Sequence, residues 1–374
     1  DAWITLKPMT GEKVVIEGTG HGPALYFYHS TCDEDEDPAP EKNCRPLYWI
    51  VEGLEVRGSA SGDGDGNAVK IDTPQVTIRH NNLCCSTADV VKVVHTAHDV
   101  EISDNEIHHP RAQAGANAQG VDIVGAHNTH VLRNHVHDIP DIGMYAKGNA
   151  RETVFEGNLV EDVVSNGIML GQSTDEDRLR EGPFETYDGV IRNNVIRRAG
   201  WACVATSSSQ HARIEFNSCF DAGSRLHGSV LISNEAEVGQ GGTRLEIRNN
   251  VFFGSAANPM IKISDHALAA PESILIDHNV YWTSAGESGA TFTWRDRGLE
   301  KVSFDQWRRA THQDGASKVA DPRFVDTQGL VPGAGSPAID AAVATDTRTD
   351  RLGHTRPCGA APDVGAYEVC PDAR

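Results

Sequence analysis

Val76-Thr-Ile-Arg-His-Asn81 is the first copy of a pattern that returns seven more times along this chain of 374 residues. Two more copies are Val100-Glu-Ile-Ser-Asp-Asn105 and Thr129-His-Val-Leu-Arg-Asn134, and the other five end at Asn158, Asn194, Asn217, Asn250 and Asn279. The shared pattern is apolar-x-apolar-x-x-Asn. The seven steps from Asn81 to Asn279 cover 198 residues, about 28 per step, and a period of this size indicates a solenoid of stacked repeats.

The pattern has a direct physical interpretation. Alternation of apolar and polar residues puts one face of each strand inside the molecule and the other outside. Asparagine suits the sharp bend after the strand, because its short side chain bonds to backbone groups and tolerates left-handed geometry. In stacked coils these asparagines should form a ladder of amide hydrogen bonds.

A second strand is expected before each asparagine strand, beginning at Val69, Val91, Val121, Met144, Ile168, Cys203, Val230 and Ile261. The first and third residues of each strand should point inward, and the second and fourth outward. The first outward column then contains Lys70, Lys92, Asp122, Tyr145, Met169, Val204, Leu231 and Lys262. The second contains Asp72, Val94, Val124, Lys147, Gly171, Thr206, Ser233 and Ser264. Charged side chains therefore concentrate on four neighbouring coils.

Five further segments carry a family resemblance. The runs 5–16 and 48–58 resemble the first coils of pectate-lyase-like right-handed parallel β-helices, and the runs 320–326, 335–340 and 363–368 are similar to the closing segment of many secreted bacterial members. The resemblance covers nearly the whole chain. It implies an all-β, single-stranded right-handed parallel β-helix of roughly ten coils with an irregular C-terminal cap. It is specific for the fold and weak for the activity, since lyases, some glycoside hydrolases, alginate epimerases and non-catalytic surface proteins share this architecture.

The expected organisation is a β-helix over residues 1–300, with loop insertions near 19–46 and 172–188. Residues 301–374 are expected to form a short helix, N-capped by Ser303, and a capping tail packed on the solenoid.

Charge and composition exclude several classes of function. The formal net charge of −20 argues against nucleic-acid binding, which requires a basic surface. No stretch approaches the roughly 18 apolar residues needed to span a membrane. No signal peptide is visible, so a leader and a first capping element are expected to be missing from the chain. We expect a monomer.

The eight cysteines favour an oxidising compartment and a secreted or cell-surface protein. Cys32 and Cys44 bracket one loop and Cys358 and Cys370 bracket the C-terminal tail, so both pairs are expected to form disulfides. Cys203 and Cys219 lie within one repeat, and Cys84 and Cys85 are adjacent. For these four residues the sequence leaves the pairing open.

The predicted function is carbohydrate-active, and a polysaccharide lyase cleaving a uronic-acid-containing polymer by β-elimination is the preferred reading. Such a lyase needs a base for the proton next to a carboxylate and a cation that offsets the developing charge. The resemblance implies a lysine or arginine base, often with calcium beside it. The predicted catalytic residues are Lys147 as the base, Tyr145, Asp122 and Lys92, and the predicted substrate-binding residues are Lys70, His127, Arg178 and Trp201. The alternative is that these lysines are solvated residues on a sheet face.

Calcium is the expected cofactor, with Asp63, Asp65 and Asn67 as ligands, because their alternate spacing presents oxygen atoms to one hard cation. The alternative there is a flexible acidic turn. His135 and His137 form an H-x-H pair, with one residue expected to point outward and the other to belong to the bend. Histidines in turn ladders are favoured there over a zinc site.

Two other functions remain open. A glycoside hydrolase would use paired carboxylates, with Asp122 and Asp141 as the candidates and Glu161 or Asp162 as weaker ones. A non-catalytic carbohydrate-binding or adhesive surface solenoid would use neither pair. A polysaccharide is the expected partner in every case.

Overall fold

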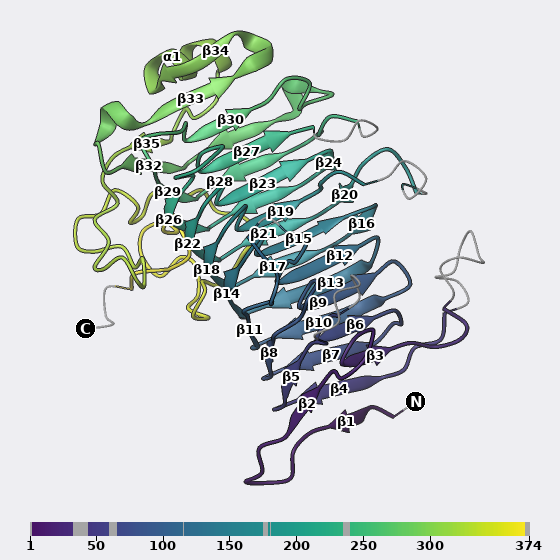
Figure 1. Cartoon of the computed structure of the whole chain (residues 1–374). Helices are drawn as coiled ribbons and strands as arrows, with labels where there is room; N and C mark the ends of the chain where they lie inside the picture. The colour runs from purple at the N-terminus through teal and green to yellow at the C-terminus, as the bar shows by residue number, and fades with distance from the viewer. Residues whose placement is uncertain are drawn as a thin grey trace.

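A computed structural model describes residues 2–32, 44–59, 66–114, 116–174, 179, 181–234 and 240–370. The chain winds into a parallel β-helix whose coils stack from the N-terminal to the C-terminal end (Figure 1). Each coil contributes one short strand to each of three sheets, here called A, B and C. Consecutive strands within a sheet are parallel and in register, except for the final pair of sheet C.

The strands of the three sheets follow one another in chain order. Sheet A contains β1 (Ile4–Leu6), β4 (Trp49–Glu52), β7 (Val76–Arg79), β10 (His98–Ser103), β13 (His127–Leu132), β17 (Val154–Glu156), β21 (Val190–Arg192), β25 (Arg213–Glu215), β28 (Glu246–Arg248) and β31 (Leu275–Asp277), with β16 (Ala150–Arg151), β20 (Thr186–Tyr187) and β24 (Ser209–Gln210) beside them. Sheet B contains β2 (Val15–Glu17), β5 (Glu55–Arg57), β8 (Asn82–Cys84), β11 (Glu106–His108), β14 (His135–Ile139), β18 (Leu159–Val163), β22 (Val195–Ala199), β26 (Ser218–Ala222), β29 (Val251–Gly254), β32 (Val280–Thr283) and β35 (Lys318–Val319). Sheet C contains β3 (Leu25–Phe27), β6 (Val69–Ile71), β9 (Val91–Val94), β12 (Val121–Val124), β15 (Met144–Lys147), β19 (Ile168–Leu170), β23 (Val204–Ser207), β27 (Val230–Ser233), β30 (Ile261–Ile263), β33 (Thr291–Trp294) and β34 (Leu299–Ser303).

The expected asparagine ladder is confirmed between sheets A and B. Asn105 accepts hydrogen bonds on Oδ1 from the backbone N–H of Asn81 (2.9 Å) and from its Nδ2 (3.0 Å). The same pair of bonds repeats on every later step, and at Asn279 the Oγ of Ser317 takes over as acceptor. The ladder satisfies buried backbone groups exactly where the chain turns, so it fixes the coil spacing.

The position of the left-handed residue differs from the expectation. The residue before the ladder asparagine has the positive φ, for example His80 (55°), Asp104 (56°) and Arg133 (54°). The asparagine itself therefore contributes side-chain hydrogen bonds to the bend, while its predecessor makes the reversal. This arrangement leaves the amide free to point along the stack.

The predicted register of sheet C is correct for most coils and wrong for one. Val204 and Thr206 pair with the inward residues Ile168 and Leu170, so both point into the core, and Ala205 and Ser207 occupy the outward positions. Cys203 lies one residue before the strand and is also buried. Because Cys203, Val204 and Ala205 are all apolar, the alternation gave no way to fix their phase, and a slip of one residue exchanges the two faces.

All eight cysteines are paired. Cys32–Cys44 and Cys358–Cys370 form the disulfides that their positions predicted. Cys84–Cys85 and Cys203–Cys219 are the other two bridges. The last of these joins the turn before β23 to an inward position of β26, so it crosses the interior of the solenoid.

The C-terminal end of the stack is closed by a change in strand direction. β34 pairs antiparallel with β33, and α1 (Phe304–Thr311) follows it. Ser303 caps this helix as expected: its Oγ accepts from the backbone of Gln306, whose side chain bonds back to Ser303. Trp307 on the inner face of the helix is buried with Phe292 in the last coil. Short 3-10 turns occur at Pro271–Ser273, Glu287–Gly289 and Arg295–Arg297.

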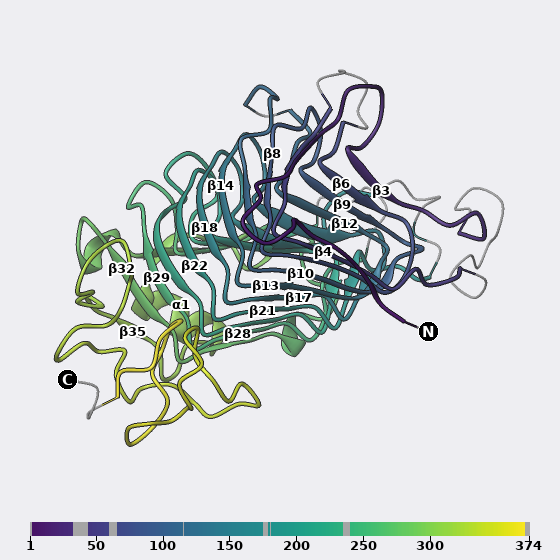
Figure 2. The same ribbon diagram turned by 90° about the horizontal axis from the view of Figure 1, so that it is seen from below.

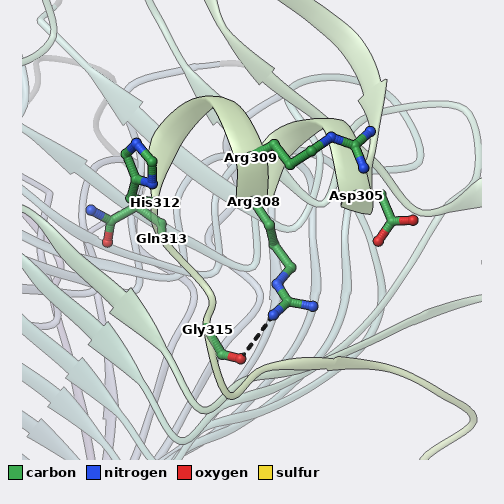
Figure 3. Close-up of a pocket in the computed structure, with 6 residues that line it drawn as sticks. All are labelled: Asp305, Arg308, Arg309, His312, Gln313 and Gly315. Carbon is green, nitrogen blue, oxygen red and sulfur yellow. Dashed lines mark hydrogen bonds between the residues drawn. The ribbon is translucent and has the colours of Figure 1, made fainter.

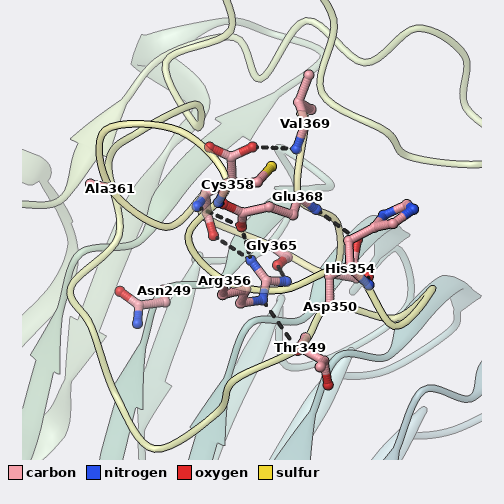
Figure 4. A network of polar contacts seen from close by, with 12 residues as sticks. Asn249, Thr349, Asp350, His354, Arg356, Cys358, Ala361, Gly365, Glu368 and Val369 are labelled. Atoms are coloured by element: carbon pink, nitrogen blue, oxygen red, sulfur yellow. Dashed lines mark hydrogen bonds and ion pairs between the residues drawn. The ribbon is translucent and has the colours of Figure 1, made fainter. Parts of the chain in front are cut away.

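The tail after β35 runs back along the outside of the solenoid (Figure 2). Arg356 organises it: its guanidinium donates to Glu368 Oε2 (2.8 Å) and to the carbonyls of Asp363 and Gly365 (Figure 4). This guanidinium also lies 4.3 Å from the ring centre of Phe216. Because several acceptors surround the buried Arg356 guanidinium, it fixes the conformation of a tail that forms no strands after β35 in its described part. The predicted boundary at residue 300 stays a prediction.

Within the described part of the chain, no helix has the length and apolar composition required to cross a bilayer.

Candidate functional site

Sheet C brings three of the predicted catalytic residues into one outward column. Asp122 of β12 pairs with Lys92 of β9 on one side and with Tyr145 of β15 on the other. Lys147 follows two residues after Tyr145 and pairs with Val124, so it also points outward, in the neighbouring column. The strand register places all four side chains on the same face of adjacent coils.

Lys92 lies between two carboxylates. Its Nζ bonds to Asp122 and, at 3.2 Å, to Asp89. Burial by itself would lower the pKa of Lys92, but the charges of Asp122 and Asp89 outweigh it and raise this pKa. Burial, followed by the charge of Asp122, raises the pKa of Asp89. Lys92 therefore stays charged and fits the role of a fixed cation, whereas a base must first lose its proton.

Tyr145 and Lys147 form the next layer of the site. The ammonium of Lys147 lies 5.2 Å from the ring centre of Tyr145. Burial, followed by the negative charge of Asp122, raises the pKa of the Tyr145 phenol well above its ordinary value. Tyr145 is 1% exposed and Asp122 is 0% exposed, whereas Lys147 is half-buried. Of these three, only Lys147 can reach a ligand on the outer surface.

The insertion after β19 is anchored next to Lys147. Glu185 accepts from the backbone N–H of Gly148 (2.8 Å), and the Asn149 Nδ2 donates to the carbonyls of Gly182 (3.0 Å) and Phe184 (2.6 Å). Burial raises the pKa of Glu185, and the charge of Lys147 opposes this rise. These bonds hold the described end of the insertion, residues 182–185, next to the turn that follows Lys147.

The predicted substrate-binding residues are spread over several coils. Lys70 is on sheet C, 3.9 Å from Asp72 and 5.4 Å from the ring centre of Tyr26. His127 is on sheet A, where its Nε2 lies 3.3 Å from Glu181 of the insertion. Trp201 is half-buried before β23, and Arg178 lies outside the described residues. These side chains do not converge on Lys147, although Glu181 ties His127 to the same insertion.

Of the predicted calcium ligands, Asp63 and Asp65 lie outside the described residues. Asn67 is buried; its Nδ2 donates to the carbonyl of Asp89, and its Oδ1 has no hydrogen-bond partner among the described residues. The predicted calcium site at Asp63, Asp65 and Asn67 therefore stays a prediction. The carboxylates of Asp89 and Asp122 do not fit calcium, because Lys92 already occupies the position between them.

Two residues of this site were missed in the sequence. Asp89 and Gln119 precede β9 and β12, in the turns that enter sheet C. Gln119 donates its N–H to Asp89 (3.0 Å) and its Nε2 to Asp141 (2.6 Å). The strand pattern carried no signal for them, because turn residues fall outside the alternation.

The carboxylates considered for a hydrolase lie on two sheets, with Asp122 on sheet C and Glu161 and Asp162 on sheet B. Asp141 is half-buried near the site, and burial raises its pKa against the hydrogen bonds from Ser165 and Gln119. Glu161 belongs to sheet B, where it binds Arg197 and Arg198. A hydrolase site that pairs Asp141 with Asp122 would require Asp122 to reach the substrate, but Asp122 is fully buried.

His135 and His137 both point outward from sheet B, so the expectation that one belongs to the bend was wrong. β14 begins at His135 and continues through the bend residue Asp138, and Val136 is the inward residue between the histidines. The rings of His135 and His137 are 4.3 Å apart. The strand is longer than the repeat pattern suggested, which moves both side chains to one face.

A second cluster further along sheet C contains Trp201, His227 and Lys262. The rings of Trp201 and His227 meet edge to face at 5.3 Å, and Lys262 Nζ is 3.4 Å from His227 Nδ1. Burial, followed by the charge of Lys262, lowers the pKa of His227 to about 4. The folded protein therefore keeps this imidazole neutral.

This pKa predicts a pH effect on stability. Between the ordinary histidine pKa of about 6.5 and the folded value of about 4, the unfolded chain binds a proton that the folded chain excludes. The wild type should lose stability relative to His227→Gln as the pH falls through this interval. Urea unfolding of both proteins measures the difference. Above about pH 7.5 the difference should be constant, and a difference that also stays constant down to pH 4 would contradict the prediction.

A shallow pocket lies at the far end of the solenoid, beside α1 (Figure 3). Asp305, Arg308, Arg309, His312, Gln313 and Gly315 line it. Arg308 donates to the carbonyl of Gly315 (3.1 Å). None of the predicted site residues lines this pocket.

Comparisons with known proteins agree with the fold. Residues 66–258 match the family model described as "Right handed beta helix region". No curated protein sequence gives a significant match. The crystal structure of pectate lyase Pel9A is similar at 13% identity and a TM-score of 0.50, covering 94% of this chain and 97% of that one. The complex of XylC with xylose is similar at 12% identity and a TM-score of 0.50, covering 86% of this chain and 59% of that one.

A third similar structure is PfbA, a surface adhesin of Streptococcus pneumoniae, at 9% identity and a TM-score of 0.45. The match covers 63% of each chain, so this chain spans less than two thirds of the adhesin. The two structures with a TM-score of 0.50 share the fold with this chain, and at 12–13% identity they leave the activity open. Because the family model matches more than half of the chain, the protein belongs to the family of the right-handed β-helix region.

Proposed function

We propose that the protein is a polysaccharide lyase that cleaves a uronic-acid-containing polymer at the outer face of sheet C. The observation that carries this proposal is the Lys147 ammonium. It is half-buried on a rigid strand, beside the Tyr145 ring, and has no hydrogen bond or ion pair with any described residue. A cationic side chain that has no carboxylate paired with it among the described residues, on a protein of net charge −20, is a suitable contact for a carboxylated sugar.

The reaction assigns a role to each group. In β-elimination a base takes the proton at C5 of the uronate, the C4–O4 bond breaks, the electron pair forms the C4–C5 double bond, and the leaving oxygen takes up a proton. Lys147 in its neutral form is the proposed base. Lys92 is bound by Asp89 and Asp122, which balance its charge, so its proposed role is to hold Asp122 in place beside Tyr145.

Asp122 and Tyr145 act as positioning residues in this proposal. Both are buried, so neither touches the polymer. Asp122 fixes Lys92, and the ring of Tyr145 supports the alkyl chain and ammonium of Lys147. Lys70 and Trp201, on other coils of the stack, are proposed to contact more distant sugar units.

A glycoside hydrolase is less well supported. Asp141 has the raised pKa of a general acid, but the second carboxylate, Asp122, is covered and bound to Lys92. A non-catalytic surface solenoid is the remaining alternative. Four disulfides support an extracytoplasmic location for any of the three.

Incubation with a panel of acidic polysaccharides tests the proposal. Pectate, alginate, chondroitin sulfate and heparin would each be followed by ultraviolet absorbance and by reducing ends, with added calcium and with chelator. A lyase produces both signals together, because each cleavage creates an unsaturated uronate. Reducing ends without absorbance would indicate a hydrolase. Neither signal on any polymer would reject the lyase for these substrates, and loss of activity with chelator would show that a calcium ion takes part.

A further inference from the structure

We infer that the protein has a binding site for a zinc-like divalent cation on the outer face of sheet B, made by His109, His137 and Asp138. The site is separate from the sheet C face and does not depend on the proposed lyase activity. One ligand atom from each of the three residues lies within 4.8 Å of the others. Zinc ligands at about 2.0–2.1 Å from the ion lie about 3.4 Å from one another, so only small side-chain rotations are required.

The fold sets this geometry through the strand register. His108 of β11 pairs with His137 of β14, so the next residues, His109 and Asp138, are neighbours on consecutive coils. Both have left-handed backbones, with φ of 46° and 54°. His109 Nε2 is 3.5 Å and His137 Nδ1 is 2.7 Å from Asp138 Oδ2.

Hydrogen bonds around the site determine which nitrogen of His109 carries its proton. Glu106 accepts from Asn82 Nδ2 (2.8 Å), so the amide oxygen of Asn82 faces His108. An amide oxygen only accepts, so His108 Nε2 must donate to it. With its proton on Nε2, a singly protonated His108 has its acceptor lone pair on Nδ1.

The proton on His109 follows from this chain of bonds. His108 Nδ1 and His109 Nδ1 are 2.7 Å apart, so His109 must donate from Nδ1. In neutral His109 the lone pair is then on Nε2, 3.5 Å from the carboxylate oxygen of Asp138. Two acceptors facing each other repel, and a cation between them relieves the repulsion.

The residues that would support such an ion are also present. Metal-bound histidines usually donate their second N–H to an acceptor that fixes the ring. Glu106 Oε1 lies 3.4 Å from His137 Nε2, and His108 accepts from His109. Each histidine ligand thus has its own supporting partner.

A competing set, Glu106, His135 and His137, also lies within 4.8 Å. His135 Nε2 is bonded to Glu161 (2.8 Å), which also binds two guanidinium groups, those of Arg197 and Arg198. Positive charge next to His135 disfavours a second cation there. In the set with Asp138, neither His109 nor Asp138 has an ion pair with an arginine or lysine among the described residues.

Zinc titration of the tag-free protein, by calorimetry and by competition with a chromophoric chelator, tests the inference. We expect one zinc ion per chain. His109→Asn and Asp138→Asn should each weaken zinc binding at least tenfold. Asparagine is used at both positions because it tolerates the left-handed backbone. The matched control is His211→Asn. His211 is also left-handed (φ 57°) and bonded to one carboxylate, Asp188, but it belongs to neither metal-ligand set, so zinc binding should not change.

Thermal unfolding with and without zinc keeps the test independent of folding defects. Zinc should raise the midpoint of the wild type and of His211→Asn, and leave that of Asp138→Asn unchanged, while all three unfold alike in chelator. The inference is overturned if the wild type binds no zinc, or if Asp138→Asn binds as tightly as the wild type. Loss of binding in His135→Gln alone would assign the ion to the competing set and would equally overturn it.

Discussion

Replacing Lys147 by alanine is expected to lower the turnover of a cleaved polysaccharide by about 10²–10⁴-fold, the usual contribution of a general base. Lys147 is the only one of the four predicted catalytic residues that combines exposure with the absence of an ion pair among the described residues. Its removal leaves the Lys92–Asp122 pair intact, so the fold should be unaffected. Initial rates of the absorbance increase measure the effect.

Two controls make this result specific. Lys301→Ala removes a lysine at the C-terminal end of the stack, in β34, and should retain full activity. Because only the neutral amine accepts a proton, the wild-type rate should rise with pH, and the residual rate of Lys147→Ala should lack this rise. Near-wild-type activity in Lys147→Ala would remove Lys147 as the base.

Replacing Asn158 by alanine is expected to destabilise the protein by roughly 3–9 kcal/mol, from three buried polar groups at about 1–3 kcal/mol each. Asn158 Oδ1 accepts from the backbone and side chain of Asn134, and its Nδ2 donates to the carbonyl of Val131 (2.9 Å) and to Asn194. Alanine satisfies none of these groups. Urea unfolding followed by circular dichroism measures the loss.

Asn117→Ala is the matched control for this effect. Asn117 is exposed and outside the ladder, so its loss should change the free energy of unfolding by less than about 0.5 kcal/mol. An equal shift in both variants would show that the ladder does not contribute to stability beyond an ordinary surface asparagine.

The fold could be predicted from the repeat because every coil buries the same alternating strand positions. A single pattern of six residues, ending at Asn81 and seven later asparagines, places strands, bends and the ladder. The predicted register was wrong where apolar and polar residues did not alternate. Residues 203–205 are all apolar, so the sequence did not show which of them point inward. The pairing of Val204 with Ile168 in the adjacent coil decides this.

The candidate site was predictable in part for the same reason. Lys92, Asp122 and Tyr145 could be aligned from the sequence because strands stack in register. Asp89 and Gln119 could not be aligned in this way, because they lie in turns whose length varies from coil to coil.

By itself, the sequence determined the solenoid, the asparagine ladder, the two bracketing disulfides and the outward column that carries Lys92 and Asp122. Those features depend on period and alternation, which are local properties of the chain. Only the tertiary structure decided which side chains are covered and that His109, His137 and Asp138 meet on sheet B. It also decided that Lys92 is held between two carboxylates, while Lys147 has no ion pair with any residue that the structure describes. Burial and charge at one residue depend on groups one coil away, about 28 residues distant in the sequence, and no local pattern encodes them.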